Sequence, residues 1–172
     1  MQLPGHRAET GVAIRPATQR DAETIGDLWV ELMNFHATLD DRFGVPPNGR
    51  VNYVRQLQKA LRDENFRVLV AVEQRRVIGY IMGYIGQNPP IFPKPRFGFI
   101  ADLCVTQLQR RHGVGERLVQ EMCHWFRARG LDCVQMNVAH NNPMSQAFWR
   151  KVGSRDYLDH MWMELSSRPD DS

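Results

Sequence analysis

The stretch VTQLQRRHGVGERLVQEMCHWF, residues 105–126, restricts the fold more than any other part of the chain. Five apolar residues in it recur at the spacing of one helical face: Leu118, Val119, Met122, Trp125 and Phe126. This spacing predicts an amphipathic helix packed against a sheet. Gly113 and Gly115 stand at the start of that helix, where the missing Cβ atoms let a ligand approach the free N–H groups of the first turn. Arg110 and Arg111 add positive charge, so the junction suits an anion, but an ordinary glycine turn before a core helix gives the same pattern.

The order of elements around this junction predicts the fold class. The chain is expected to form a strand at 12–17, a helical region ending near 39, a helix at about 51–63, a hairpin over 66–86, a strand at 97–105, the helix described above, a strand at 132–138, a helix at 142–153 and a last strand at 157–165. Four prolines between 87 and 96 exclude a central strand there and indicate a loop. The order βααβββαβαβ predicts a mixed α/β fold, with a mostly antiparallel sheet flanked by helices.

Length and composition narrow the class of protein. With 172 residues and no internal repeat, the chain is expected to form one domain at 11–166, preceded by a disordered N-terminus at 1–10 and followed by a flexible tail at 167–172. The formal net charge is only +3 and no basic run occurs, so neither nucleic acid nor a membrane is expected as a partner. Three cysteines without a CxxC pair predict neither a disulfide framework nor a metal site. A cytoplasmic location is the expectation because no signal peptide is evident.

Two sequence motifs distinguish between the phosphate-binding folds. The chain has no G-x-x-x-x-G-K-[ST] loop and no full G-x-G-x-x-G after its first strand, which disfavours nucleotide hydrolases and dinucleotide-binding units. RRHGVG after a strand ending in DLCV, followed about 30 residues later by NNPMSQAFWRKVG, resembles the two motifs of the GNAT superfamily of acyl-CoA N-acyltransferases. The resemblance extends to the order of elements from about residue 12 to 165.

The resemblance implies a site for coenzyme A. Backbone groups from Arg110 to Glu116 would hold the pyrophosphate, and the backbone of the strand at 97–105 would pair with the pantetheine arm, in a gap that separates it from the strand at 132–138. Trp149 would form a wall of the acyl-CoA channel. The cofactor-binding residues implied in this way are Cys104, Val105, Arg110, Arg111, His112, Gly113, Val114, Gly115, Glu116, Asn142 and Trp149.

Asp102 is the candidate base. Amine acylation needs a group that accepts the proton of the amine, and a carboxylate in the mostly apolar strand IADLCV would have a raised pKa if it were buried. The two-residue period of a strand predicts that Asp102 shares a face with Ile100 and Cys104. An ion-paired structural aspartate, or a base that acts through water, would fit the same residue.

The acid that protonates the leaving thiolate is harder to assign. Where many GNAT members have tyrosine before x-K-x-G, this chain has Trp149, whose indole N–H is no practical proton donor. The thiolate leaves without a direct donor, or another residue substitutes, with Tyr157, Tyr84 and Cys104 as candidates. A Cys104 nucleophile is also conceivable, although no histidine partner is identifiable.

The resemblance therefore implies an N-acetyltransferase that uses acetyl-CoA as co-substrate. It would transfer the acetyl group to a primary amine of a small molecule or peptide by direct attack in a ternary complex. The acceptor would lie between the loop at 36–43 and the proline-rich loop, and polyamines, amino acids, aminoglycosides and protein amines all stay open. The alternative is a non-catalytic acyl-CoA sensor of the same fold, which the loss of tyrosine at 149 favours. A homodimer formed through the terminal strands is implied by the resemblance alone.

Overall fold

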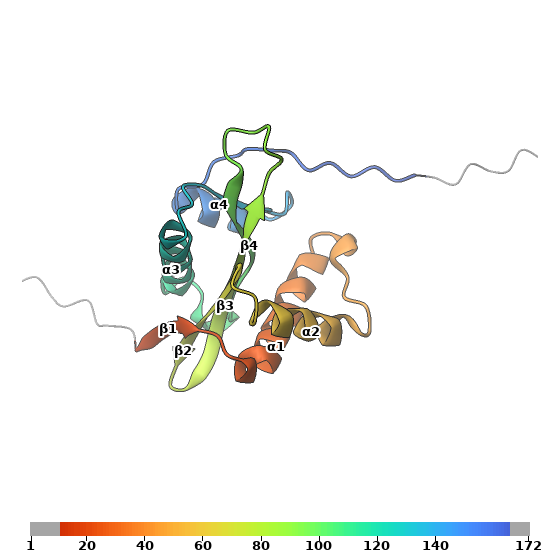
Figure 1. The fold of residues 1–172 in the computed structure, drawn as a ribbon. Coiled ribbons are helices and arrows are strands. Elements are labelled where there is room, and N and C mark those ends of the chain that lie inside the picture. Colours follow the sequence, from red (N-terminus) through yellow and green to blue (C-terminus); the bar gives the residue numbers. More distant parts are fainter. Residues whose placement is uncertain (1–10, 166–172) are drawn as a thin grey trace, which may run out of the picture.

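The computed structural model describes residues 11–165, so the expected disordered N-terminus and flexible tail lie outside the described residues. One five-stranded sheet in the order β1-β2-β3-β4-β5 forms the centre of the domain (Figure 1). Its strands are β1 (Val12–Pro16), β2 (Phe66–Glu73), β3 (Arg76–Gln87), β4 (Arg96–Val105) and β5 (Val134–Met136). The first four pair antiparallel, whereas β5 runs parallel to β4. The predicted mixed α/β fold with a mostly antiparallel sheet is confirmed.

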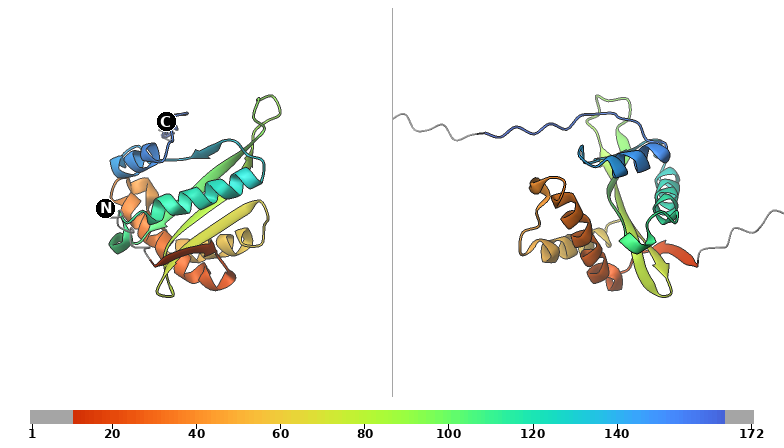
Figure 2. Two further views of the ribbon diagram at one scale, coloured as in Figure 1. Left: turned by 90° about the vertical axis from the view of Figure 1, so that its left-hand side faces the viewer. Right: turned by 180° about the vertical axis from the view of Figure 1, so that it is seen from behind.

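Helices cover both faces of this sheet. One side carries α1 (Ala22–Ala37) and α2 (Gly49–Ala60), and the other carries α3 (Val114–Ala128) and α4 (Pro143–Lys151), as Figures 1 and 2 show. No helix among residues 11–165 is long and apolar enough to cross a membrane. The predicted order of elements holds as far as α4. Residues 157–165, expected to be the last strand, instead form no strand and run as an extended segment away from the domain (Figure 2).

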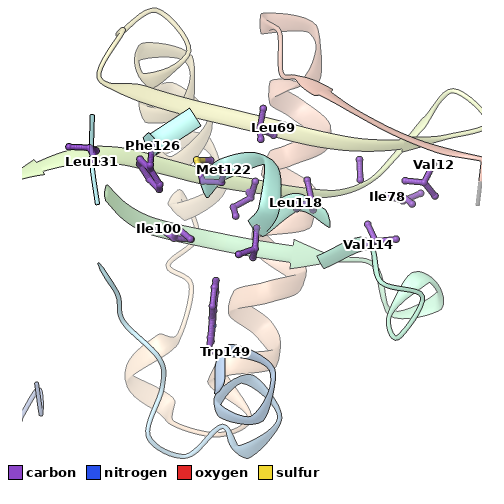
Figure 3. Packing of buried hydrophobic residues seen from close by; sticks show 13 residues of the cluster. Val12, Leu69, Ile78, Ile100, Val114, Leu118, Met122, Phe126, Leu131 and Trp149 are labelled. Carbon is purple, nitrogen blue, oxygen red and sulfur yellow. The ribbon is translucent and has the colours of Figure 1, made fainter. Parts of the chain in front are cut away.

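The alternation of apolar residues along the strands builds two cores. In β2, Leu69 and Ala71 face α3, while Val68 and Val70 face α1 and α2. The α3 side holds the larger cluster, which includes Leu118, Met122 and Phe126 (Figure 3). Gly98 allows this close packing, because a Cβ atom there would lie 2.7 Å from the ring of Phe126. The helix predicted from the glycine junction is therefore anchored firmly, and its N-terminal turn has a fixed place at the end of β4.

A bulge in β4 changes which side chains face each core. The register pairs Met82 with Asp102 and Gly83 with Ile100, so Ala101 has no partner on β3. An extra residue in one strand of a pair shifts the alternation that follows it. Ile100 consequently faces the α3 core, whereas Asp102 and Cys104 face α1 and α2. The expectation that Asp102 shares a face with Cys104 is confirmed, and the expectation that it shares one with Ile100 is wrong because of the bulge.

The pairing of β4 with β5 stops early. Only Gly98–Ile100 of β4 pair with Val134–Met136 of β5, and residues 101–105 have no partner strand on that side among the described residues. The backbone groups along this part of β4 form a free edge. It lies at the end of the strand that leads into α3.

Candidate active site

The N-terminus of α3 is an open cradle of backbone groups. Gly113 caps the helix with a φ of 79°, a left-handed conformation that favours glycine, and Arg111 has a φ of 66°. A Cβ atom at Gly113 would meet nothing within 4 Å. The first N–H groups of the helix have no partner within it and carry the positive end of its dipole. The cradle therefore has the space, the donors and the sign of charge that a pyrophosphate requires.

The side chains around the cradle contribute less than their charges suggest. Arg110 turns toward α1: its Nε donates to the carbonyl oxygen of Val105 at 3.0 Å, its guanidinium lies 3.5 Å from the carboxylate of Glu31, and it stacks over the ring of Phe35. Arg111 and His112 are exposed. Glu116 pairs with Lys151 of α4. Donors for a phosphate thus come mainly from the backbone.

Three further residues of the expected cofactor site join α4 to the rest of the domain. Asn142 is buried, and its Oδ1 accepts a hydrogen bond of 3.0 Å from the backbone N–H of Ser145, which caps α4. Its Nδ2 lies 3.5 Å from Nε2 of His36, at the end of α1, and burial lowers the pKa of that histidine. Trp149 is only 7% exposed and points from α4 toward Ile100 (Figure 3). Trp149 is therefore part of the α3-side core.

Asp102 belongs to a hydrogen-bond network on the α1–α2 side. The hydroxyl of Tyr53 in α2 donates to Oδ2 of Asp102 at 2.9 Å and lies 3.1 Å from the hydroxyl of Tyr80 in β3. Because a hydroxyl has one proton, Tyr80 donates to Tyr53 when Tyr53 donates to Asp102. Trp29 stacks flat on Tyr53, with ring centroids 4.4 Å apart. Burial raises the pKa of Asp102, although the Tyr53 hydrogen bond opposes the shift.

Sequence reasoning identified Asp102 but missed Tyr53 and Tyr80. Both tyrosines come from elements far from β4 in the chain, and the bulge at Ala101 decides that Asp102 faces them. Neither residue stands in a motif that points to a site. A carboxylate that is partly accessible, joined to two hydroxyls and raised in pKa has the properties of a general base.

Comparisons with known proteins decide the family. The sequence profile of the acetyltransferase (GNAT) family matches residues 29–153. The chain belongs to the GNAT acetyltransferase family.

Individual relatives agree with this assignment. The chain is 33% identical over 58 residues to GCN5-related N-acetyltransferase 6, chloroplastic, of Arabidopsis thaliana, a stretch that spans 34% of this chain and 20% of that relative. Its fold is similar to that of a tetramutant of the BH1408 protein from Bacillus halodurans, with a TM-score of 0.81, 24% identity and coverage of 89% of this chain and 99% of the other. It is also similar to a predicted acetyltransferase with acetyl-CoA from Clostridium acetobutylicum, with a TM-score of 0.72, 15% identity and coverage of 90% and 96%.

The structure places the candidate acids of this GNAT protein at three separate sites. Tyr157 lies in the C-terminal segment and is 73% exposed, apart from the Asp102 network. Tyr84 stacks between Phe66 and Phe99. Cys104 is buried, its Sγ lies 3.4 Å from the carbonyl oxygen of Leu28, and burial raises the pKa of the thiol to about 12. A thiol with such a pKa stays protonated at neutral pH, which argues against Cys104 as a nucleophile.

The structure also bears on metals. Among residues 11–165, no group of three or more His, Cys, Asp or Glu side chains is arranged to hold a metal ion.

Proposed function

We propose that this GNAT protein transfers an acetyl group from acetyl-CoA directly to a primary amine of a small molecule or peptide. One observation carries the proposal: the same end of β4 holds the free backbone edge at 101–105, the carboxylate of Asp102 and, after a short connection, the open cradle at Gly113. A site for an acyl carrier and a base for an amine are thus neighbours on one strand.

Each part of that strand end has a task in the proposed site. The backbone N–H groups from Arg110 to Glu116 would hold the pyrophosphate, with Gly113 leaving the room. The peptide groups of Cys104 and Val105 would pair with the pantetheine arm, as an added strand pairs with a sheet edge. Asn142 and Trp149 would line the gap from the α4 side. When bound, acetyl-CoA supplies the acetyl group as an activated thioester.

Asp102 would take the proton of the attacking amine. An amine is mostly protonated at neutral pH, so a carboxylate beside it first attracts the cation and then accepts its proton. The raised pKa of Asp102 strengthens it as a base, and the hydrogen bond from Tyr53 holds its carboxylate in place. Tyr80 supports Tyr53 from behind.

The leaving thiolate needs no dedicated acid in this proposal. A thiol has a pKa near 8.5, so its conjugate base is a good leaving group and solvent can protonate it. Tyr157 stays a candidate donor only if the C-terminal segment takes another position in the working protein, because it is exposed where it stands.

The alternative function is a non-catalytic acyl-CoA sensor of the same fold. The burial of Trp149 at the position of the usual tyrosine supports it. A sensor would bind acetyl-CoA without accelerating transfer to any amine, whereas an enzyme would release coenzyme A only when an amine is present.

Calorimetric titration of acetyl-CoA tests the cradle. Gly113→Glu places bulk and negative charge in it, and Gly130→Glu is a matched control, because Gly130 also has a positive φ, also has open space around its Cβ position and lies at the other end of α3. We expect micromolar binding by the parent and by Gly130→Glu, and none by Gly113→Glu. Equal binding by both variants would refute the cradle, and an amine screen with the parent would then separate enzyme from sensor.

We further propose that the protein acts in the cytoplasm and as a homodimer. Cys104, Cys123 and Cys133 are all free thiols, which suits a reducing compartment. Cell fractionation tests the location, and the assembly is considered next.

A further inference from the structure

The C-terminal segment, residues 157–165, exposes an unusual amount of apolar surface. Six of its nine side chains are large hydrophobic groups that are 67–90% exposed: Tyr157, Leu158, Met161, Trp162, Met163 and Leu165. No backbone hydrogen bond joins the segment to the rest of the described chain. Contiguous apolar surface of this kind in a soluble domain marks a site of interaction.

The pattern of the segment is that of a strand. Met161, Met163 and Leu165 recur with the two-residue period that places side chains on one face, and the opposite face carries His160 and Glu164. Figure 2 shows the segment running extended from the end of α4. The sequence therefore encodes a strand that has no sheet in its own described chain.

The sheet offers one edge that lacks a strand. β5 pairs with β4 on one side only, and no charged residue or proline protects its other edge between Cys133 and Val138. Val134, Met136 and Val138 lie at the same two-residue period and pack against the α3-side core. A strand added to this edge with Met161, Met163 and Leu165 on the core face would extend that core.

The observed position of the segment points away from its own edge. Trp162 lies over the guanidinium of Arg42, 5.4 Å from its ring centroid, in the connection between α1 and α2. That contact leaves Trp162 67% exposed, so it does not cover the apolar surface. Two identical chains solve this problem reciprocally, because each supplies the strand that the other lacks and the contact closes as a dimer.

We propose that residues 157–165 pair with β5 of a second copy of this chain, so that two protomers exchange their C-terminal strands. The proposal specifies the contact behind the homodimer and does not depend on acetyl transfer. Both of its tests read mass or cross-links, so they can fail while the enzymatic proposal stands, and the reverse.

The first test is the mass in solution by light scattering. We expect a dimer of about twice 19.9 kDa for the parent, a monomer for the double variant Met161→Glu/Met163→Glu and a dimer for the control His160→Glu, which changes the opposite face. The exposure of these side chains means that the variants keep a folded domain, which circular dichroism checks. A monomeric parent, or a dimer that survives the double variant, overturns the proposal.

The second test separates exchange from pairing within one chain. Gln135→Cys and Met163→Cys are combined with Cys123→Ser and Cys133→Ser, and a short bis-maleimide joins the two new cysteines. Exchange predicts a cross-link between chains, which migrates as a dimer on a denaturing gel. A cross-link confined to one chain would show that the segment returns to its own β5 and would overturn the proposal.

Discussion

The two halves of the candidate active site are built in different ways. At the Gly113 cradle the ligand groups are backbone N–H groups, and the surrounding side chains are exposed or turned elsewhere. At Asp102 the functional groups are side chains, brought together from α2, β3 and β4. The first half depends on local conformation and the second on tertiary register. We therefore expect the cradle to tolerate changes of side chain, and the Asp102 network to respond to each of them.

The largest expected effect is that of Asp102→Asn. Removal of a general base lowers kcat by about 10²- to 10⁴-fold. Acetyl-CoA affinity should stay within about threefold of the parent, because Asp102 faces α1 and α2 and the cradle is made by backbone. Steady-state kinetics with an accepted amine, together with calorimetry, measure both. Full activity of this variant would remove Asp102 from the mechanism and the comparison with it.

Local and distant determinants also explain what the sequence could predict. RRHGVG and the apolar face of α3 lie within one stretch of chain, so the helix start, its glycine cap and its anchoring followed from spacing alone. The same holds for β1 to β4, whose alternation survives in the structure.

The features that the sequence left out depend on contacts between distant elements. The bulge at Ala101 arises from the register of β3 against β4, and no residue pattern in β4 announces it. Tyr53 and Tyr80 reach Asp102 only through that register. The last strand was predicted from its own residues, but a strand needs an edge to pair with, and the described chain brings none to it.

The next effect concerns the support of the base. In Tyr53→Phe, Asp102 loses a hydrogen bond that lowers its pKa, so the pKa rises further and the acidic limb of the pH profile of kcat/KM moves to higher pH. We expect a loss of about tenfold near the limb, comparable to one charge-assisted hydrogen bond. Tyr84→Phe is the matched control, since that hydroxyl lies on the same sheet face outside the network. An unshifted limb in Tyr53→Phe would contradict the coupling.

A smaller effect separates a catalytic aspartate from a structural one. The folded-state pKa of Asp102 is raised, so the charged form destabilises the fold, and this cost appears as pH rises from the unfolded pKa through the folded one. A pKa that is higher by one in the folded protein than in the unfolded chain costs about 1.4 kcal/mol, so Asp102→Asn should be more stable than the parent by about 1 kcal/mol at pH 8. The difference should vanish near pH 4. Urea unfolding at both values measures it, and an ion-paired structural aspartate would give the opposite sign at pH 8.

The smallest effect is expected at the cradle itself. His112 stands beside Gly113, but its side chain is exposed, so His112→Ala leaves the backbone donors where they are. The dissociation constant for acetyl-CoA should change by less than about threefold, within the range of an exposed charge beside an anion. Gly113→Glu, one residue later, should abolish binding, and the contrast between neighbours measures how far the backbone alone holds the pyrophosphate. A tenfold loss in His112→Ala would mean that side chains hold it, and both halves of the site would then obey the same rule.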